Sequence, residues 1–253
     1  MKKALLFTIF YYFLMFNNVL NAQSEQHFRA GIAAGINLSQ MDGDGQQGYH
    51  KVGLAIGVKG AYCFKPNFDV STELMYNSRG SRPNPFSPKA SFEDKSIQIK
   101  AELNYADVLL AANFHFMPNE NYTFYRQSLQ IGVSYGRLLS STLNINRGIY
   151  HDQIVEADVQ RNLKKDDIGF VVGYSWFLTS RLGITAKHTF SLRNIYYNPK
   201  EGATNLDYTS FIPYNLTLQL VYNLFSPKLN VRGQVEKARK KNERKKHNPL
   251  EDL

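Results

Sequence analysis

The sequence contains one short segment whose residue types could support hydrolysis, His188-Thr-Phe-Ser191. A serine nucleophile needs a basic side chain within hydrogen-bonding distance. The segment lies in a stretch that alternates apolar and polar residues, as a β-strand does, and positions 188 and 191 then point to opposite faces. We therefore predict no catalytic pair. The six histidines lack the spacing of a metal site, so we expect neither a metal nor another cofactor.

Eight segments share this alternation, and it is strictest in 214–225, YNLTLQLVYNLF, where one face carries only Leu and Tyr and the other is mostly polar. Apolar residues toward lipid and polar residues toward a lumen are typical of a membrane barrel strand. In one segment Leu103 and Tyr105 are out of phase with Val108 and Leu110, which predicts a bulge near Ala106. The segments are 27–39, 52–64, 68–77, 103–116, 128–140, 167–177, 181–192 and 214–225.

The connections between these segments alternate in length. The first, third, fifth and seventh are long, and the second, fourth and sixth are short. Outer-membrane barrels combine long extracellular loops with short periplasmic turns. We therefore predict an all-β fold, an eight-stranded antiparallel transmembrane up-and-down barrel over residues 23–226. Its N- and C-termini would lie in the periplasm and its long loops outside the cell.

The N-terminal segment predicts export. Lys2 and Lys3 precede an apolar stretch from Ala4 to Phe16, and Ala22 offers a small residue for cleavage. We assign residues 1–22 to a signal peptide, because the apolar stretch is too short to cross a bilayer as a helix. The sequence has a single cysteine, Cys63, so we expect no internal disulfide and assign this thiol to packing.

The inward positions of the predicted strands include four basic and four acidic residues. The interior of an eight-stranded barrel is only wide enough for its own side chains. A buried charge without a partner costs several kcal/mol, so the charges should pair. We therefore expect them to fill the lumen and to leave no open pore. They are Arg29, Lys59, Asp69, Glu73, Asp107, Asp167, Lys187 and Arg193.

Residues 227–253 form a basic extension after the last strand. The chain has a net charge of +9, and residues 228–253 hold nine Lys and Arg against four acidic residues. Two interpretations stay open: a solvated, disordered arm, or a periplasmic arm that binds an acidic partner or the head groups of the inner leaflet. We expect no nucleic-acid partner in the periplasm. The candidate contact residues are Lys237, Arg239, Lys240, Lys241, Arg244, Lys245 and Lys246.

Most of the chain resembles a known family. The segments LNYADVLLAANFHF, SLQIGVSYGRLLSS, DDIGFVVGYSWF and RLGITAKHTFSLRNIYY resemble successive strands of the PorT family of outer-membrane barrels of Bacteroidota. GIAAGINLSQM and FDVSTELMYNSRGS are similar to the first and third strands of that family. The resemblance covers about 28–225 and implies a small barrel without catalytic residues. The family's namesake implies a part in protein secretion by the type IX system. The basic extension departs from the family pattern.

These features favour a non-enzymatic outer-membrane barrel that serves as a structural or accessory subunit of a secretion (type IX-like) or outer-membrane assembly complex. Two alternatives remain open, a small lipid A-modifying barrel enzyme and a small-solute channel. The expected partners are outer-membrane lipid and lipopolysaccharide, together with a larger outer-membrane or periplasmic protein complex. We expect no small-molecule substrate.

Overall fold

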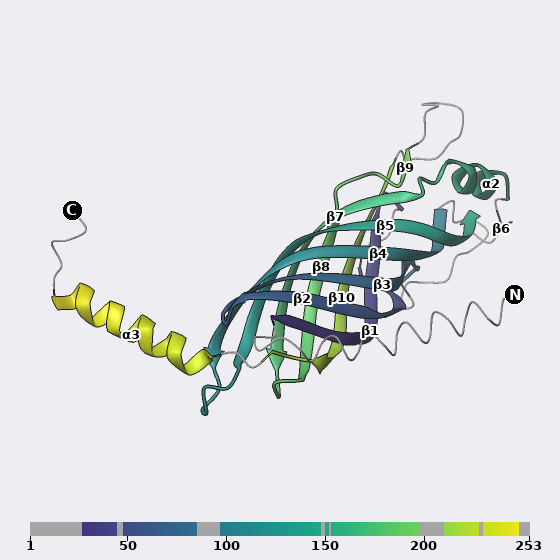
Figure 1. Cartoon of the computed structure of the whole chain (residues 1–253). Coiled ribbons are helices and arrows are strands. Elements are labelled where there is room, and N and C mark those ends of the chain that lie inside the picture. The colour runs from purple at the N-terminus through teal and green to yellow at the C-terminus, as the bar shows by residue number, and fades with distance from the viewer. Residues whose placement is uncertain are drawn as a thin grey trace, which may run out of the picture.

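Eight long β-strands form a closed antiparallel ring in the computed structural model (Figure 1), which confirms the predicted fold class. The structure describes residues 27–44, 48–84, 97–147, 150–151, 153–197, 210–227 and 230–247. Each strand pairs with its neighbour in chain order, and pairing of the first with the last, from Asp42↔Ile212 to Ala30↔Phe225, closes the ring. The strands are β1 (Phe28–Asp42), β2 (Lys51–Lys65), β3 (Phe68–Ser81), β4 (Ile97–Pro118), β5 (Tyr125–Arg147), β7 (Asp166–Phe177), β8 (Leu182–Ser191) and β10 (Ser210–Phe225).

The two ends of the ring differ in their connections. Short turns at 66–67, 119–124 and 178–181 lie at one end, together with the start of β1 and the end of β10. We call this the turn end. The strand ends that are joined by the long connections 43–50, 82–96, 148–165 and 192–209 lie at the other, which we call the loop end. The predicted sorting of long and short connections is therefore confirmed. The segment assigned to a signal peptide, 1–22, lies outside the described residues.

The outer face of the ring is apolar. Leu54, Ile56 and Val58 of β2, for example, are about half exposed, while the residues between them face inward. The pattern runs along β2 from Val52 to Phe64, which gives an apolar band about 28 Å tall at ~3.3 Å per residue and a tilt of ~45°. This height matches the hydrocarbon layer that an outer-membrane barrel crosses. Neither described helix is long and apolar enough to cross a bilayer.

Aromatic side chains gather on the outer face at the turn end. The rings of Tyr62 and Phe64 lie 4.8 Å apart, those of Phe64 and Phe68 5.9 Å apart, and those of Phe68 and Phe114 5.1 Å apart. Phe28 joins them through Tyr62, at 5.1 Å. We call these five residues the turn-end girdle. Such girdles lie at the level of the lipid head groups, so this one marks where the bilayer ends.

β4 and β5 rise above their neighbours at the loop end. β5 pairs with β7 only as far as Arg137, and beyond that point it pairs with β4 and, at its very end, with a short strand from the following connection. The register shifts where Asn104 pairs with Ser140 but Tyr105 pairs with Leu138, so the extra residue is Leu139. The predicted bulge near Ala106 was therefore placed in the wrong strand. The odd-numbered residues of β4 point inward throughout 99–115. Those on the loop-end side of the bulge are apolar, and they are buried because other apolar groups cover them there.

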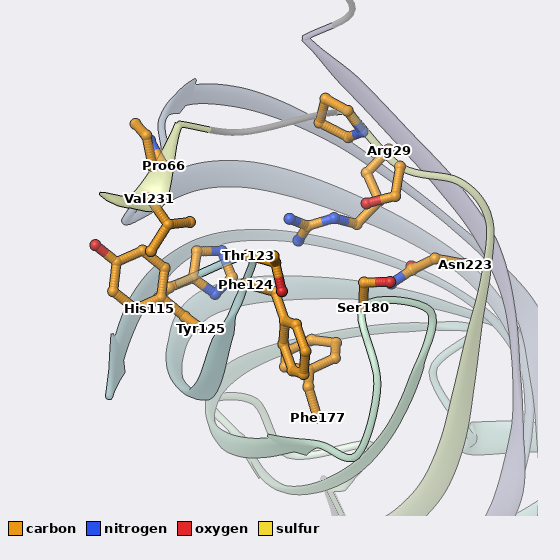
Figure 2. Close-up of a pocket in the computed structure, with 12 residues that line it drawn as sticks. Arg29, Pro66, His115, Thr123, Phe124, Tyr125, Phe177, Ser180, Asn223 and Val231 are labelled. Atoms are coloured by element: carbon orange, nitrogen blue, oxygen red, sulfur yellow. The ribbon is translucent and has the colours of Figure 1, made fainter. Parts of the chain in front are cut away.

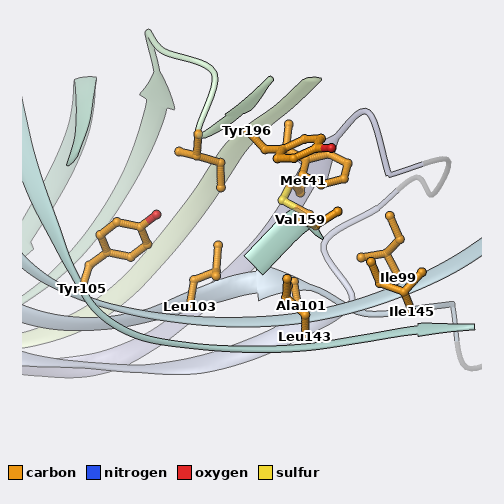
Figure 3. Close-up of a cluster of buried hydrophobic side chains, with 11 residues drawn as sticks. Met41, Ile99, Ala101, Leu103, Tyr105, Leu143, Ile145, Val159 and Tyr196 are labelled. Carbon is orange, nitrogen blue, oxygen red and sulfur yellow. The ribbon is translucent and has the colours of Figure 1, made fainter. Parts of the chain in front are cut away.

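These covering groups close the loop end. Side chains from β1, β4, β5 and β10 meet helix α2 (Gln153–Asn162) and the short strand β9 (Tyr196–Tyr197) in one buried apolar cluster (Figure 3). A second short strand, β6 (Tyr150–His151), pairs with the end of β5. The cluster holds Met41, Ile99, Ala101, Leu103, Tyr105, Leu143, Ile145, Val159, Ile195, Tyr196 and Phe211. Because the strands that supply it lie around the ring, the cluster covers the mouth of the barrel.

Helix α3 (Val231–His247) occupies most of the basic extension and starts at the turn end. Figure 1 shows it running off to one side of the barrel. Val231 is buried, at 1% exposure, and the side-chain amide of Gln234 donates to Asn67 at 2.5 Å. The hydroxyl of Tyr125 donates to Gln234 at 3.2 Å. The first turn of α3 is thus packed on the barrel, which counts against a disordered arm for 231–247.

Candidate functional site

The lumen holds three layers of charged side chains, and β3 supplies one central residue to each. Asp69, Glu73 and Arg79 have odd numbers in one strand, so they point to the same inward face. All three are buried, at 1%, 0% and 3% exposure. We name the layers after these residues. Together they run from the turn end toward the loop end.

The Asp69 layer lies nearest to the turn end. Arg29 of β1 donates to the Asp69 carboxylate at 2.9 Å, and Nε2 of His115 lies 2.6 Å from it. The amide of Asn113 donates to the other carboxylate oxygen at 2.6 Å. One carboxylate therefore joins side chains from β1 and β4 to β3, and both of its oxygens have partners.

The Glu73 layer lies in the middle of the barrel. Lys59 of β2 donates to one oxygen of Glu73 at 3.0 Å, and Lys187 of β8 donates to the other at 2.5 Å. Gln130 of β5 adds a longer bond of 3.4 Å. A Cβ on Gly173 would lie 3.0 Å from Gln130 and 3.1 Å from Lys187, so glycine makes room for this layer. The layer links strands on opposite sides of the ring.

The Arg79 layer lies beneath the apolar cluster. The guanidinium of Arg79 donates to Asp107 at 2.6 Å and to Asp167 at 2.9 Å. The carbon at its centre stands 4.3 Å from the ring centroid of Tyr105, a cation–π distance. Ser191 donates a hydrogen bond to Asp167 as well. The positive charge of Arg79 is thus enclosed by two carboxylates and an aromatic face.

The structure brings together seven of the eight predicted lumen charges. Arg193 is the exception, and the prediction for it is wrong. β8 ends at Ser191, and Arg193 is exposed beyond that end. Its place is taken by Arg79, which falls in the third predicted connection, one of the long ones; extending the alternation of β3 by one step from Asn77 would have placed it inward. The three layers balance four basic against four acidic residues.

A hollow opens at the turn end of the lumen (Figure 2). It is lined by Pro66 and Phe124 of the turns, by Tyr125 at the start of β5 and by Val231 of α3, and Arg29 points into it. A second, deeper hollow continues past His115 to Asp69 and Lys59. Both hollows lie in the turn-end half of the barrel, while the apolar cluster covers the opposite mouth.

His188 and Ser191 lie apart, as predicted. The hydroxyl of Tyr49 lies 2.7 Å from Nε2 of His188 on the outer side, whereas Ser191 points inward to Asp167. Burial, assisted by the carboxylate of Asp42, raises the pKa of the Tyr49 phenol, so this side chain stays neutral. Among the described residues, no group of three or more His, Cys, Asp or Glu could hold a metal ion. Cys63 is buried, in keeping with a role in packing.

The predicted contact residues of the extension lie on α3. Lys237, Arg239, Lys240 and Lys241 are exposed, and positions 244–246 fall in the last turns of the helix. Arg239 is paired with Glu243 at 3.0 Å, and Arg232 with Glu236 at 3.5 Å. The three lysines form no ion pair within the described part of the chain. Cationic groups without an internal partner are available for external ones.

The comparison with known protein families agrees with this architecture. Residues 21–197 match the family described as "Outer membrane protein beta-barrel domain". Similar solved structures include Ail of Yersinia pestis (14% identity, 79% of this chain, 100% of that chain, TM-score 0.40), OprG of Pseudomonas aeruginosa (13%, 79%, 95%, 0.34) and outer membrane protein W of E. coli (15%, 80%, 100%, 0.36). No curated protein matches the sequence. With a closed ring of eight strands and a family match over more than half of its length, this chain belongs to the outer membrane β-barrel domain family and is an integral outer-membrane protein.

Proposed function

We propose that this protein is a non-catalytic accessory barrel of a larger outer-membrane machine for protein secretion or outer-membrane assembly. The observation that carries the proposal is the filled lumen. Three layers of paired charges and an apolar cluster occupy the interior, so the groups left for function lie on the outside. These are the lipid-facing wall, the loop end and α3.

The same proposal fixes an orientation. The turn end, with both chain termini and α3, would face the periplasm, and the loop end would face outward. The support is the sorting of long connections to one end, which outer-membrane barrels place outside the cell. Residues 1–22 would then be the signal peptide that directs export.

The resemblance to the PorT family supports the choice of secretion. The resembling segments belong to six of the eight strands, and they include the β3 segment that supplies the centre of each charged layer. On this proposal the protein serves a type IX-like machine. The extension that departs from the family, residues 227–253, would give this chain a contact of its own.

Affinity purification of the full chain from gently solubilised outer membranes tests the accessory role. We expect larger outer-membrane or periplasmic proteins to be recovered with it in reproducible stoichiometry. Recovery of the barrel alone, from membranes in which a known complex stays intact through the same detergent, would count against the proposal.

A small-solute channel is the second candidate, and the hollows at the turn end favour it. Such a channel would have to pass the Glu73 and Arg79 layers and then the apolar cluster. Planar bilayers separate the two functions. The accessory role predicts no stepwise conductance from the purified full chain, whereas regular conductance steps would establish the channel.

A lipid A-modifying enzyme is disfavoured because His188 and Ser191 face opposite sides of the wall. Mass spectrometry of lipid A, from cells with and without the gene, decides this directly. The proposal predicts identical spectra.

A further inference from the structure

The charged residues of α3 are divided between two sides of the helix. At about 100° per residue, Arg232, Glu236, Arg239 and Glu243 share one side, where they form the two ion pairs described above. Lys237, Lys240 and Lys241 lie on another side, at the spacing of three and four residues that places side chains next to each other. We call these three the lysine stripe. One side of α3 is therefore internally neutral, and the other carries unpaired positive charge.

The lysine stripe continues the edge of α3 that touches the barrel. Gln234, which bonds to Asn67 and Tyr125, lies three residues before Lys237 and seven before Lys241. Residues at these spacings share one helix face. Because the first turn is held by these bonds and by the burial of Val231, the rotation of the helix about its own axis is fixed. Lys237 and Lys241 thus face in the same direction as Gln234, toward the level of the barrel turns, and Lys240 lies next to Lys237 at the edge of this face.

The surface at that level is the lipid head-group layer. Asn67 stands in the turn between Phe64 and Phe68, and both of these belong to the turn-end girdle that marks the edge of the bilayer. Since α3 runs to one side of the barrel (Figure 1), its later turns extend past the barrel wall. The next surface that they meet beside the wall is the membrane.

We propose that the lysine stripe binds anionic phospholipid head groups of the leaflet at the turn end. Phosphate groups complement three unpaired ammonium groups, and polybasic segments at a membrane surface gain about 1 kcal/mol per Lys or Arg. The helix needs no insertion for this contact, because the barrel already holds it at the interface. An acidic protein could attract the same charges, but it would have to reach a helix side that faces the bilayer. The inference does not rest on the accessory role.

A label on α3 in lipid nanodiscs tests the contact. The probe is a fluorophore on A238C in a C63A background, and the quencher is a nitroxide on the head group of a minor phosphatidylcholine component. Full-length protein is compared in discs of phosphatidylcholine and in discs of equal parts phosphatidylcholine and phosphatidylglycerol. We expect stronger quenching in the anionic discs, and we expect added salt to abolish the difference because salt screens such contacts.

A matched pair of variants assigns the effect to the stripe. K237Q/K241Q and R232Q/R239Q each remove two positive charges, the first from the lysine stripe and the second from the ion-paired side. We expect the ratio of docked to undocked helix in anionic discs to fall about 30-fold in the first variant and much less in the second. Barrel folding, followed by the intrinsic fluorescence of Trp176 before labelling, should be the same in both.

Three results would overturn the inference. The first is equal quenching in neutral and anionic discs, which would show that the helix is not held by lipid charge. The second is an equal fall in both variants, which would show that only net charge matters. Loss of a co-purified acidic protein from K237Q/K241Q, with unchanged quenching in the discs, would assign the stripe to that protein and reject lipid.

Discussion

The lumen and α3 both carry many charges, but they arrange them differently. In the lumen each carboxylate lies within 3 Å of at least one basic group, whereas the lysine stripe of α3 has no ion-pair partner in the described part of the chain. Burial explains the first arrangement, since an unpaired charge inside a barrel costs several kcal/mol. The lysines of the stripe are exposed to water, which solvates their charge, so they need no ion-pair partner. Paired charges therefore stabilise this fold, and the unpaired ones are available for binding.

Removing one lumen charge should have the largest effect. E73Q leaves Lys59 and Lys187 buried without their carboxylate, which we expect to lower the free energy of unfolding by about 3–5 kcal/mol. Urea titration in lipid vesicles, followed by the fluorescence of Trp176, measures it. The matched control is E120Q, because Glu120 pairs with Arg126 at an exposed turn. That change should cost less than about 1 kcal/mol. Equal losses of unfolding free energy in E73Q and E120Q would show that pairing stabilises the fold no more in the lumen than at the exposed turn.

A new charge on the outer wall should rank next. L110R places a cation on the lipid face in the middle of β4, where we expect a loss of about 2–4 kcal/mol. Leu139, the bulge residue above the end of β7, provides the comparison. L139R lies nearer to the loop end and should cost about 0–1 kcal/mol. Urea titration in lipid vesicles measures both losses. A larger loss in L139R than in L110R would show that the bilayer lies nearer to the loop end than the turn-end girdle indicates.

Loosening α3 should have a smaller and local effect. Q234A removes the two hydrogen bonds to the turn end, each contributing about 0.5–1.5 kcal/mol. We expect faster amide exchange over 231–247 and an unchanged barrel. R239A is the control, since Arg239 is exposed on the side of α3 away from the lysine stripe, its i,i+4 pair with Glu243 contributes little, and the substitution keeps helix propensity. Faster exchange in R239A as well would show that Gln234 does not hold the helix.

The smallest effect should come from the misassigned charge. Arg193 is exposed, so R193Q should change stability by less than about 0.5 kcal/mol, while R79Q leaves Asp107 and Asp167 unpaired and should approach the loss in E73Q. Urea titration of these two variants checks that Arg79, and not Arg193, is the arginine in the lumen. A large loss in R193Q would restore the original assignment.

The barrel could be predicted from alternation alone because both faces of its membrane band follow one rule. The rule ends above the bilayer. There Ile99, Leu143 and Ile145 point inward although they are apolar, since α2 covers them, and a period of two cannot say whether a covering element exists. Leu139 is an extra residue, so inward and outward positions of β5 swap after it. The alternation therefore did not show that the strand continues to Arg147. The packed start of α3 depends on contacts with distant turns, which no local pattern records.

The column of charges on β3 also has a consequence for how the barrel assembles. A slip of this strand by one residue would turn Asp69, Glu73 and Arg79 toward lipid. A slip by two residues would keep the faces but would place Ser, Met or Asn at each of the three central positions. The spacings of four and six residues differ, so a slip by four restores an acid at one layer at most. The sequence of β3 therefore specifies a single register with its neighbours. An intermediate in another register loses charge pairing in at least two layers, which raises its free energy before the ring closes.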